Sequence, residues 1–201
     1  MSASRLATCL RLPVLLLTLG LALGGCGING IPTAEEQAKA KWSDVLNQYQ
    51  RRSDLIPNLV ETVKGYAQQE KDVLTQVVEA RAKATSVRVD ASTITDPAQF
   101  KQFQDAQTQL SGALGRLLAV SEAYPDLKSN QNFLALQSQI EGTENRIAVA
   151  RRDYIEAVRV YNTELKTFPG AIWASTLYRN NKPMETFTIS EQQMQVPKVK
   201  F

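Results

Sequence analysis

The sequence predicts an all-α protein, an antiparallel up-and-down four-helix bundle followed by an extended C-terminal tail. Apolar residues recur at steps of three and four through most of residues 34–169, which is the spacing of a helix with one buried face and not that of a strand. The turns between the periodic stretches are short, which makes successive helices antiparallel neighbours. A single helix of this kind cannot bury its apolar face, whereas four packed together can.

The N-terminal residues have the order of a secretory signal peptide. Two arginines precede an apolar run over residues 12–23, and small residues follow it. This run is shorter than the about 20 residues that a helix needs to cross a bilayer. A signal peptide of residues 1–25 that is removed on export is therefore favoured over a transmembrane helix.

Residues 23–26, Leu-Gly-Gly-Cys, resemble the lipobox of bacterial lipoproteins. The resemblance implies that Cys26 becomes the first residue, that acyl chains such as palmitate modify it, and that residues 26–33 form a tether. Several acyl chains on one residue give stable attachment to a membrane. Gly27, not aspartate, follows the cysteine, as in the outer-membrane-directed lipoproteins of diderm bacteria. An ordinary exported protein in which Cys26 is unmodified is the alternative.

The composition excludes several classes of enzyme. The chain has no histidine, and its two cysteines are Cys9, in the signal segment, and Cys26. Cysteine nucleophiles, Ser-His-Asp triads and zinc sites built from His or Cys are therefore excluded after processing. The formal net charge of +3 falls to +1 when the two arginines of the signal segment are removed, which gives no reason to expect a nucleic-acid partner. We predict no enzymatic activity, no cofactor and no metal.

The first half of residues 34–169 is predicted to hold two helices. Thr33 and Glu36 match a capping box, which predicts a helix start at residue 34. Pro57 disfavours a continuous helix and Asp54 is suited to cap a new one, so helices over 34–53 and 55–86 with a tight turn between them are favoured. One kinked helix that continues through Pro57 is the alternative.

The second half begins at Asp96-Pro97, where a capping residue followed by proline predicts a helix start. This helix ends near Tyr124, and a fourth helix covers about residues 133–168. The segments between and after them are predicted to be two loops and a C-terminal region with a short helix and an extended strap: residues 87–96, 125–132 and 170–201.

The buried faces of these helices are predicted from the same spacing. Val78 and Phe168 fall on the apolar faces of their helices. The aromatic residues that match core spacing are Trp42, Tyr49, Tyr66, Phe100, Phe103, Phe133 and Tyr154.

Three stretches taken in order resemble the LemA family: RRSDLIPNLVETVKGYA at 51–67, EAYPDLKSNQNFLALQ at 122–137 and EGTENRIAVARRDYIEAVRVYN at 141–162. FPGAIWA at 168–174 and VPKVKF at 196–201 also fit. The resemblance covers nearly all of residues 34–201 and implies an antiparallel four-helix bundle held at a membrane on the exported side, with no established enzymatic activity. Family members commonly carry an N-terminal transmembrane helix, whereas here a lipobox cysteine takes its place.

Polar residues around Pro57 admit two interpretations. One is an anion site at the start of a second helix, where free backbone N–H groups point outward. The favoured one is a turn clamp, in which the aspartate caps the second helix and the arginines bond the last carbonyls of the first. The residues concerned are Arg51, Arg52, Asp54 and Asn58.

Charged residues of the fourth helix are predicted to pair between helices and to fix register. Glu144 and Arg151 lie on one face, with Lys64, Arg81 or Glu61 as possible partners of the charges in this helix. Asn162 is predicted on the core side, where a buried amide specifies alignment. Two carboxylates from different helices, such as Glu61 and Glu144, represent the least favoured alternative, an acid and base pair of an enzyme.

The favoured function is a membrane-anchored, non-catalytic helical module of the cell envelope, a protein-interaction or scaffold component. We expect a membrane, reached through the N-terminal lipid, and another envelope protein as partners, and we do not expect a small-molecule ligand. The expected protein contacts are the loops at 87–96 and 125–132, because exposed loops commonly carry binding residues. A carrier or sensor of an apolar ligand such as a lipid is the alternative.

Overall fold

The computed structural model describes residues 27–90 and 92–188, and in these residues every regular element is a helix. The predicted signal peptide, Cys26 and the last residues of the tail lie outside the described residues. Three short elements accompany the four long helices. The elements are α2 (Gly30–Lys64), α3 (Lys71–Ser86), the 3-10 helix η1 (Thr93–Thr95), α4 (Pro97–Ser121), α5 (Pro125–Lys128), α6 (Gln131–Glu164) and α7 (Gly170–Thr176). The all-α prediction is confirmed for the described part of the chain.

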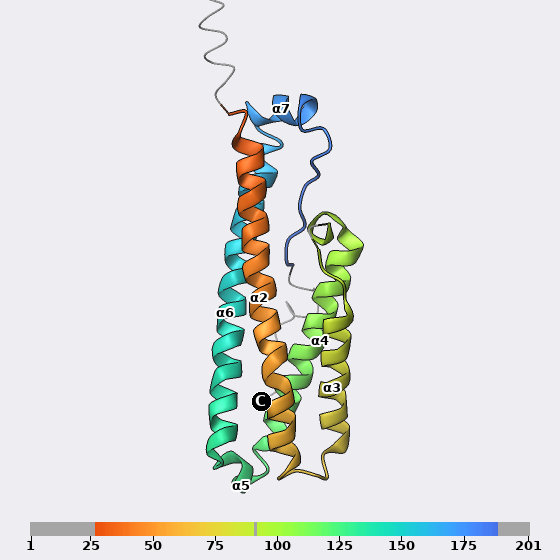
Figure 1. Cartoon of the computed structure of the whole chain (residues 1–201), viewed down its shortest axis with the longest axis vertical. Coiled ribbons are helices and arrows are strands. Elements are labelled where there is room, and N and C mark those ends of the chain that lie inside the picture. The colour runs from red at the N-terminus through yellow and green to blue at the C-terminus, as the bar shows by residue number, and fades with distance from the viewer. Residues whose placement is uncertain (1–26, 91, 189–201) are drawn as a thin grey trace, which may run out of the picture.

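The four long helices lie lengthwise beside one another (Figure 1). α2 packs along α6, α3 packs along α4, and α2 also contacts α3. The short helix α7 lies at one end of the molecule and α5 lies at the other. We call these two ends the α7 end and the α5 end.

The prediction of a helix break before Pro57 is wrong, because α2 continues through this proline. Proline has no N–H, so the carbonyl of Ser53, four residues earlier, loses its helical partner. The Nε of Arg81 on α3 donates a hydrogen bond to this carbonyl at 2.9 Å. A side chain from a neighbouring helix thus replaces the bond that Pro57 removes.

The start of α2 also differs from the prediction. The helix begins at Gly30, its N-cap is Asn29, and no side chain caps it. Residues 30–33, predicted as part of the tether, are therefore helical, and the capping box predicted for Thr33 and Glu36 is absent. The carboxylate of Glu36 instead bonds Lys39 at 3.0 Å.

The actual break in the first half of the chain lies at residues 65–70, which separate α2 from α3. The N–H groups of Gly65 and Ala67 bond carbonyls of the last turn of α2, at 3.3 and 2.8 Å. Tyr66 lies in this turn and is 45% exposed, although a core position was predicted for it.

The predicted starts of the last two long helices are close to those observed. Asp96 caps α4 by accepting bonds from the N–H groups of Ala98 and Gln99 at 2.9 and 3.2 Å, which confirms the Asp96-Pro97 signal. Asn130 caps α6 by accepting from Phe133 N at 3.0 Å. α6 ends at Glu164, four residues before the predicted end at residue 168.

The core consists of two clusters, one in each half of the molecule. The cluster toward the α5 end contains Leu59, Val63, Leu110, Leu117 and Phe133, all almost fully buried. The cluster toward the α7 end is aromatic. In this cluster the ring of Trp42 lies 5.6, 5.2, 5.2 and 6.1 Å, between centroids, from the rings of Phe100, Phe103, Tyr154 and Phe187.

The predicted strap is present in residues 177–188, which run lengthwise between α2 and α4 in Figure 1. Met184 and Phe187 of the strap are 5% and 7% exposed and belong to the aromatic cluster. The hydroxyl of Tyr154 donates to the carbonyl of Glu185 at 2.8 Å, and Gln104 Nε2 donates to the carbonyl of Thr188 at 2.7 Å. The strap therefore closes the aromatic half of the core.

Two more predicted core residues are exposed. Val78 is 51% exposed because α3 turns Leu74 and Val77 inward instead. Phe168 is 82% exposed because α6 has already ended at Glu164. The first difference reflects the orientation of α3 and the second the earlier end of α6.

Candidate functional site

A layer of buried polar side chains separates the two core clusters. Along α2 the layer falls between Tyr49, in the aromatic cluster, and Ile56, in the other one. The chain crosses the same level again in α4 and α6. The buried members of this layer are Arg52 (1% exposed), Ser53 (4%), Gln107 (8%) and Thr143 (0%). We call these residues, together with Ser111 and Glu144, the polar layer.

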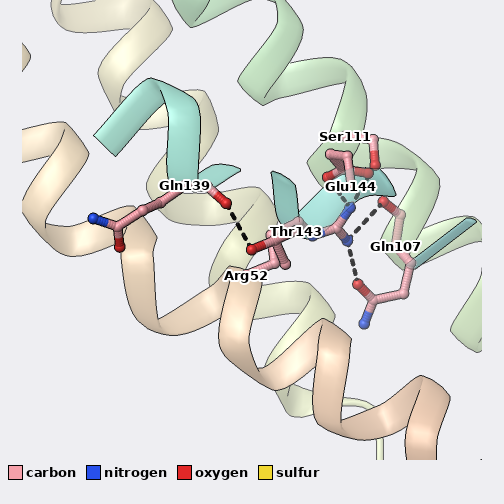
Figure 2. A network of polar contacts seen from close by, with 6 residues as sticks. All are labelled: Arg52, Gln107, Ser111, Gln139, Thr143 and Glu144. Atoms are coloured by element: carbon pink, nitrogen blue, oxygen red, sulfur yellow. Dashed lines mark hydrogen bonds and ion pairs between the residues drawn. The ribbon is translucent and has the colours of Figure 1, made fainter. Parts of the chain in front are cut away.

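Arg52 is the centre of the polar layer and connects three helices (Figure 2). Its Nη1 donates to Glu144 Oε1 on α6 at 2.8 Å and to Ser111 Oγ on α4 at 2.6 Å. Its Nη2 donates to Gln107 Oε1 on α4 at 2.6 Å. Hydrogen bonds of this kind, with an ionised donor, are stronger than neutral ones. One side chain of α2 therefore holds both α4 and α6.

The neighbours of Arg52 complete the layer. The guanidinium carbon lies 5.0 Å from the ring centroid of Tyr49, within the range of a cation–π contact. Burial raises the pKa of the Tyr49 phenol, and the positive charges of Arg151 and Arg52 partly oppose this increase. Thr143 turns its hydroxyl back to the carbonyl of Gln139 at 2.7 Å, so its polar group is satisfied within α6.

The remaining long helix, α3, contacts the same level through a backbone atom of α2. Arg81 of α3 bonds the carbonyl of Ser53, the residue that follows Arg52. Contacts at this single level thus connect α2 with α3, α4 and α6. Two buried atoms of the layer, Arg52 Nε and Ser53 Oγ, have no hydrogen-bond partner among the described residues.

The arrangement holds helices in register and assembles no acid and base pair. The one carboxylate of the layer, that of Glu144, is bonded to the Arg52 guanidinium. Glu61 follows Arg52 by nine residues in α2, about 13 Å along the helix, and is exposed beside Lys64 at 3.6 Å. The two carboxylates considered as an enzymatic pair, Glu61 and Glu144, are therefore not brought together.

The turn clamp and the anion site predicted around Pro57 are both wrong, because no helix ends or begins there. Asp54 is exposed and accepts a bond from Gln50 Nε2 at 2.7 Å instead of capping a helix. Arg51 and Asn58 are also exposed, and only Arg52 of the four residues points into the core.

The prediction that charges pair between helices holds for Glu144, but its partner is Arg52 and not one of the residues proposed for it. Arg151 lies against the strap, with its guanidinium carbon 4.4 Å from the ring centroid of Phe187. Asn162 also serves the strap. Its Nδ2 donates to the carbonyl of Met184, and its Oδ1 accepts from the N–H of Met184, both at 2.9 Å. This amide fixes the position of the strap and not the register of two helices.

The two predicted contact loops are partly folded. In the segment 125–132, α5 buries Leu127 completely. In the segment 87–96, η1 buries Ile94, and the carbonyl of Ile94 accepts a bond from Glu185 N of the strap at 2.7 Å. The segment 87–96 is therefore already in contact with the strap of the same chain.

Sequence reasoning did not identify Ser53, Ser111 or Thr143 as members of a layer. Arg52 was noticed, but it was placed at a helix end. An arginine one turn after a core aromatic, on the predicted apolar face of an uninterrupted helix, would have been the signal. The break predicted before Pro57 places Arg52 at a helix end, so its position on the buried face of α2 is not predicted.

The hollow that the polar layer itself lines is small. The hollow beside Tyr49, Ser53 and Gln107 has a volume of about 250 Å³, below the usual 300–1,000 Å³ of ligand pockets. No three potential metal ligands converge in residues 27–90 and 92–188. Across these same residues, no helix combines the length and the apolar character that a membrane span requires.

Fold and site together define an all-helical protein, in which long helices are held at one level by a buried arginine and are closed at one end by a C-terminal strap. The chain belongs to the LemA family, whose model matches residues 41–201. The resemblance found in the sequence is thereby confirmed.

Named relatives come from two kinds of bacteria. Magnetosome protein MamQ 2 of Paramagnetospirillum magneticum is 27% identical over 157 residues, and MamQ of Magnetospirillum gryphiswaldense is 24% identical over the same length. Each match covers 70% of this chain and 58% of the relative. Protein LemA of Metamycoplasma hominis is 26% identical over 118 residues, 59% of this chain and 50% of that protein. The chain thus spans about half the length of these relatives, between 50% and 58%.

Proposed function

We propose that this protein is a lipid-anchored, non-catalytic module of the bacterial cell envelope that presents a helical body to another envelope protein. The observation that carries the proposal is the position of the lipobox. Cys26 immediately precedes Gly27, and the 35-residue helix α2 begins at Gly30. A lipid on Cys26 would therefore hold one end of the helical body at the membrane. Gly27 after the cysteine favours the outer membrane in a diderm bacterium.

The helical body is suited to display because it is long. We interpret the four long helices as an antiparallel up-and-down bundle, since the chain meets the two core clusters in opposite order in α2 and α6. α2 alone extends about 52 Å at 1.5 Å per residue. The α5 end would then lie tens of ångströms from an anchor at the α7 end.

A non-catalytic role agrees with the composition and with the polar layer. The chain has no histidine, and its most deeply buried charge is bonded to three side chains of two other helices. The hollow beside this layer is smaller than usual ligand pockets, which argues against a carrier that encloses a lipid among the helices at this level.

We place the protein contact toward the α5 end. Tyr66, Val78 and Leu134 are 45%, 51% and 47% exposed there. Val78 also lines a groove of about 670 Å³ between α2 and α3, whose rim carries charged residues of both signs. An apolar floor with a charged rim is the usual composition of a protein contact.

Two experiments test the proposal. Cells that produce the Cys26→Ser variant are fractionated, and the variant should appear in the soluble exported fraction instead of the membrane. Unchanged retention of the variant in the membrane fraction would contradict a lipid anchor. Pull-down from detergent-solubilised envelope should recover a partner that Val78→Lys loses. Val149→Lys is the matched control, because Val149 is 48% exposed on α6 and lies outside the groove. Recovery of no protein above background, or equal loss in both variants, would argue against the proposed contact.

A further inference from the structure

Three of the most exposed apolar side chains of the described residues gather at the α7 end. Phe168 is 82% exposed, Leu177 is 60% exposed and Ile172 is 49% exposed. Phe168 lies in the turn after α6, Ile172 lies in α7, and Leu177 directly follows α7. We call these three side chains the apolar corner. α7 lies across this end of the molecule (Figure 1), and no other helix of the described residues covers its outer side.

The apolar corner lies where the chain emerges from the N-terminal segment. A Cβ placed on Gly27 would come within 2.9 Å of Pro169 Cγ, so the two residues are in direct contact. Gly27 also has a φ of 100°, which a side chain would strain. Pro169 directly follows Phe168, and Cys26 is one peptide unit of about 3.8 Å from Gly27. Gly27, which is covalently joined to the lipobox cysteine, therefore lies beside the apolar corner.

The segment that carries the apolar corner is basic, although two carboxylates of neighbouring helices lie near it, that of Glu164 beside Gly170 and that of Glu35 bonded to Asn181. Residues 165–184 contain Lys166, Arg179 and Lys182 and no acidic residue. All three basic side chains are exposed. Exposed basic groups beside apolar side chains are the combination by which segments bind the interface of an anionic membrane.

Trp173 belongs to the same helix. Its half-buried ring packs against the aromatic cluster, and its Nε1 is buried without a hydrogen-bond partner among the described residues. Because Trp173 lies on α7, between Phe168 and Leu177 in the sequence, its ring can report whether this end of the molecule approaches a bilayer.

We propose that the apolar corner inserts into the interface of a phospholipid bilayer that contains anionic lipid. This inference rests on the proposed lipid anchor at Cys26, and it adds a second contact between the protein and the membrane. The two contacts together fix the tilt of the helical body, whereas an anchor alone would leave it free to rotate about one point.

The tryptophans provide the probe. The full chain, produced in a bacterium and extracted from its membranes, is reconstituted into phosphatidylcholine and phosphatidylglycerol vesicles, with or without bromine in the upper part of the acyl chains. Bromine quenches tryptophan only at close range. Trp173 should be quenched, and the quenching should disappear in Trp173→Phe, because Trp42 is 3% exposed and lies inside the core.

Variants separate the apolar corner from other exposed surfaces. Phe168→Ser with Ile172→Ser should reduce the quenching at least two-fold, because it removes the inserted side chains. Tyr66→Ser with Leu134→Ser is the matched control at the α5 end, and it should leave the quenching unchanged. Vesicles of phosphatidylcholine alone should give weaker quenching, because the basic groups lose their anionic partners.

Sedimentation with the vesicles distinguishes the two proposals. Wild-type protein that sediments with vesicles but is quenched no more than Trp173→Phe would overturn the insertion and leave the anchor in place. Protein that stays in the supernatant would overturn the anchor and the insertion together. The wild-type measurement decides the question even if a serine variant fails to fold.

Discussion

The guanidinium of Arg52 links two pairs of helices that also meet through the apolar core. α2 packs along α6, and α3 packs along α4. The bond from Arg52 to Glu144 joins the two helices of the first pair. The bonds from Arg52 to Ser111 and Gln107 join α2 to α4 of the second pair. Glu144 is 39% exposed, so water screens part of this ion pair. Gln107 is buried and has no such access to solvent.

Replacing Arg52 should therefore destabilise the fold. We expect Arg52→Met to lower the free energy of unfolding by about 2 kcal/mol, because the buried acceptor on Gln107 loses its donor while the apolar chain still fills the space. Arg51→Met, at an exposed position, should change it by less than about 0.5 kcal/mol. Urea unfolding followed by circular dichroism in detergent measures both. Equal effects of the two substitutions would show that the polar layer does not hold the helices.

Pro57 permits a second test at the residue scale. In Pro57→Ala the new N–H can bond the Ser53 carbonyl, so we expect stability to rise by about 1 kcal/mol, less than the ~3 kcal/mol of an uncompensated proline. Arg81→Met should destabilise the wild-type protein by more than it destabilises the Pro57→Ala variant, because that variant no longer needs the bond from Arg81. A double-mutant cycle by urea unfolding measures the difference. Strictly additive effects would contradict the compensation.

At the scale of elements, the strap and α6 form one unit. Asn162 bonds both backbone groups of Met184, and the Tyr161 hydroxyl donates to the carbonyl of Lys182 at 3.1 Å. The side chains of Met184 and Phe187 then fill the aromatic cluster. Release of the strap would expose this cluster on one side.

Asn162→Ala should loosen the strap without unfolding the long helices. We expect faster hydrogen exchange in peptides that cover residues 180–188, because the Met184 amide loses its acceptor. Asn145→Ala, an exposed amide on the same helix, is the control and should leave exchange in these peptides unchanged. Hydrogen exchange followed by mass spectrometry measures both, and equal protection in the two variants would refute a role for Asn162.

Elements were predictable from the sequence where their cause is local. Asp96 caps α4 through its own neighbours, so two adjacent residues are sufficient to identify that end. The path through Pro57 was not predictable in this way, because it depends on Arg81, 24 residues later in the sequence. The polar layer was missed for the same reason: Arg52 has partners 55 to 92 residues away, and periodicity carries no information about such partners.

At the scale of the whole molecule, buried phenols determine the response to alkaline pH. Burial raises the pKa of Tyr49, Tyr154 and Tyr161 in the folded protein. Between the unfolded pKa of about 10 and the higher folded values, the folded state binds more protons than the unfolded state. The contribution of these phenols to stability is therefore fully present below this window, and it is lost as pH rises through the window.

The expected result is a urea midpoint that decreases above about pH 10. Tyr154→Phe should make the decrease less steep, because it removes one of the phenols. Unfolding curves followed by circular dichroism from neutral to alkaline pH measure this. A midpoint that stays constant through about pH 11 would show that these phenols ionise freely in the folded protein.

The proposed lipid on Cys26 would hold the helical body at the membrane by its α7 end. Intact-mass spectrometry of the protein extracted from membranes tests it most directly. We predict a mass that lacks residues 1–25 and exceeds the remaining polypeptide by the mass of acyl chains on Cys26. A mass that retains residues 1–25, or a processed chain with an unmodified cysteine, would contradict it.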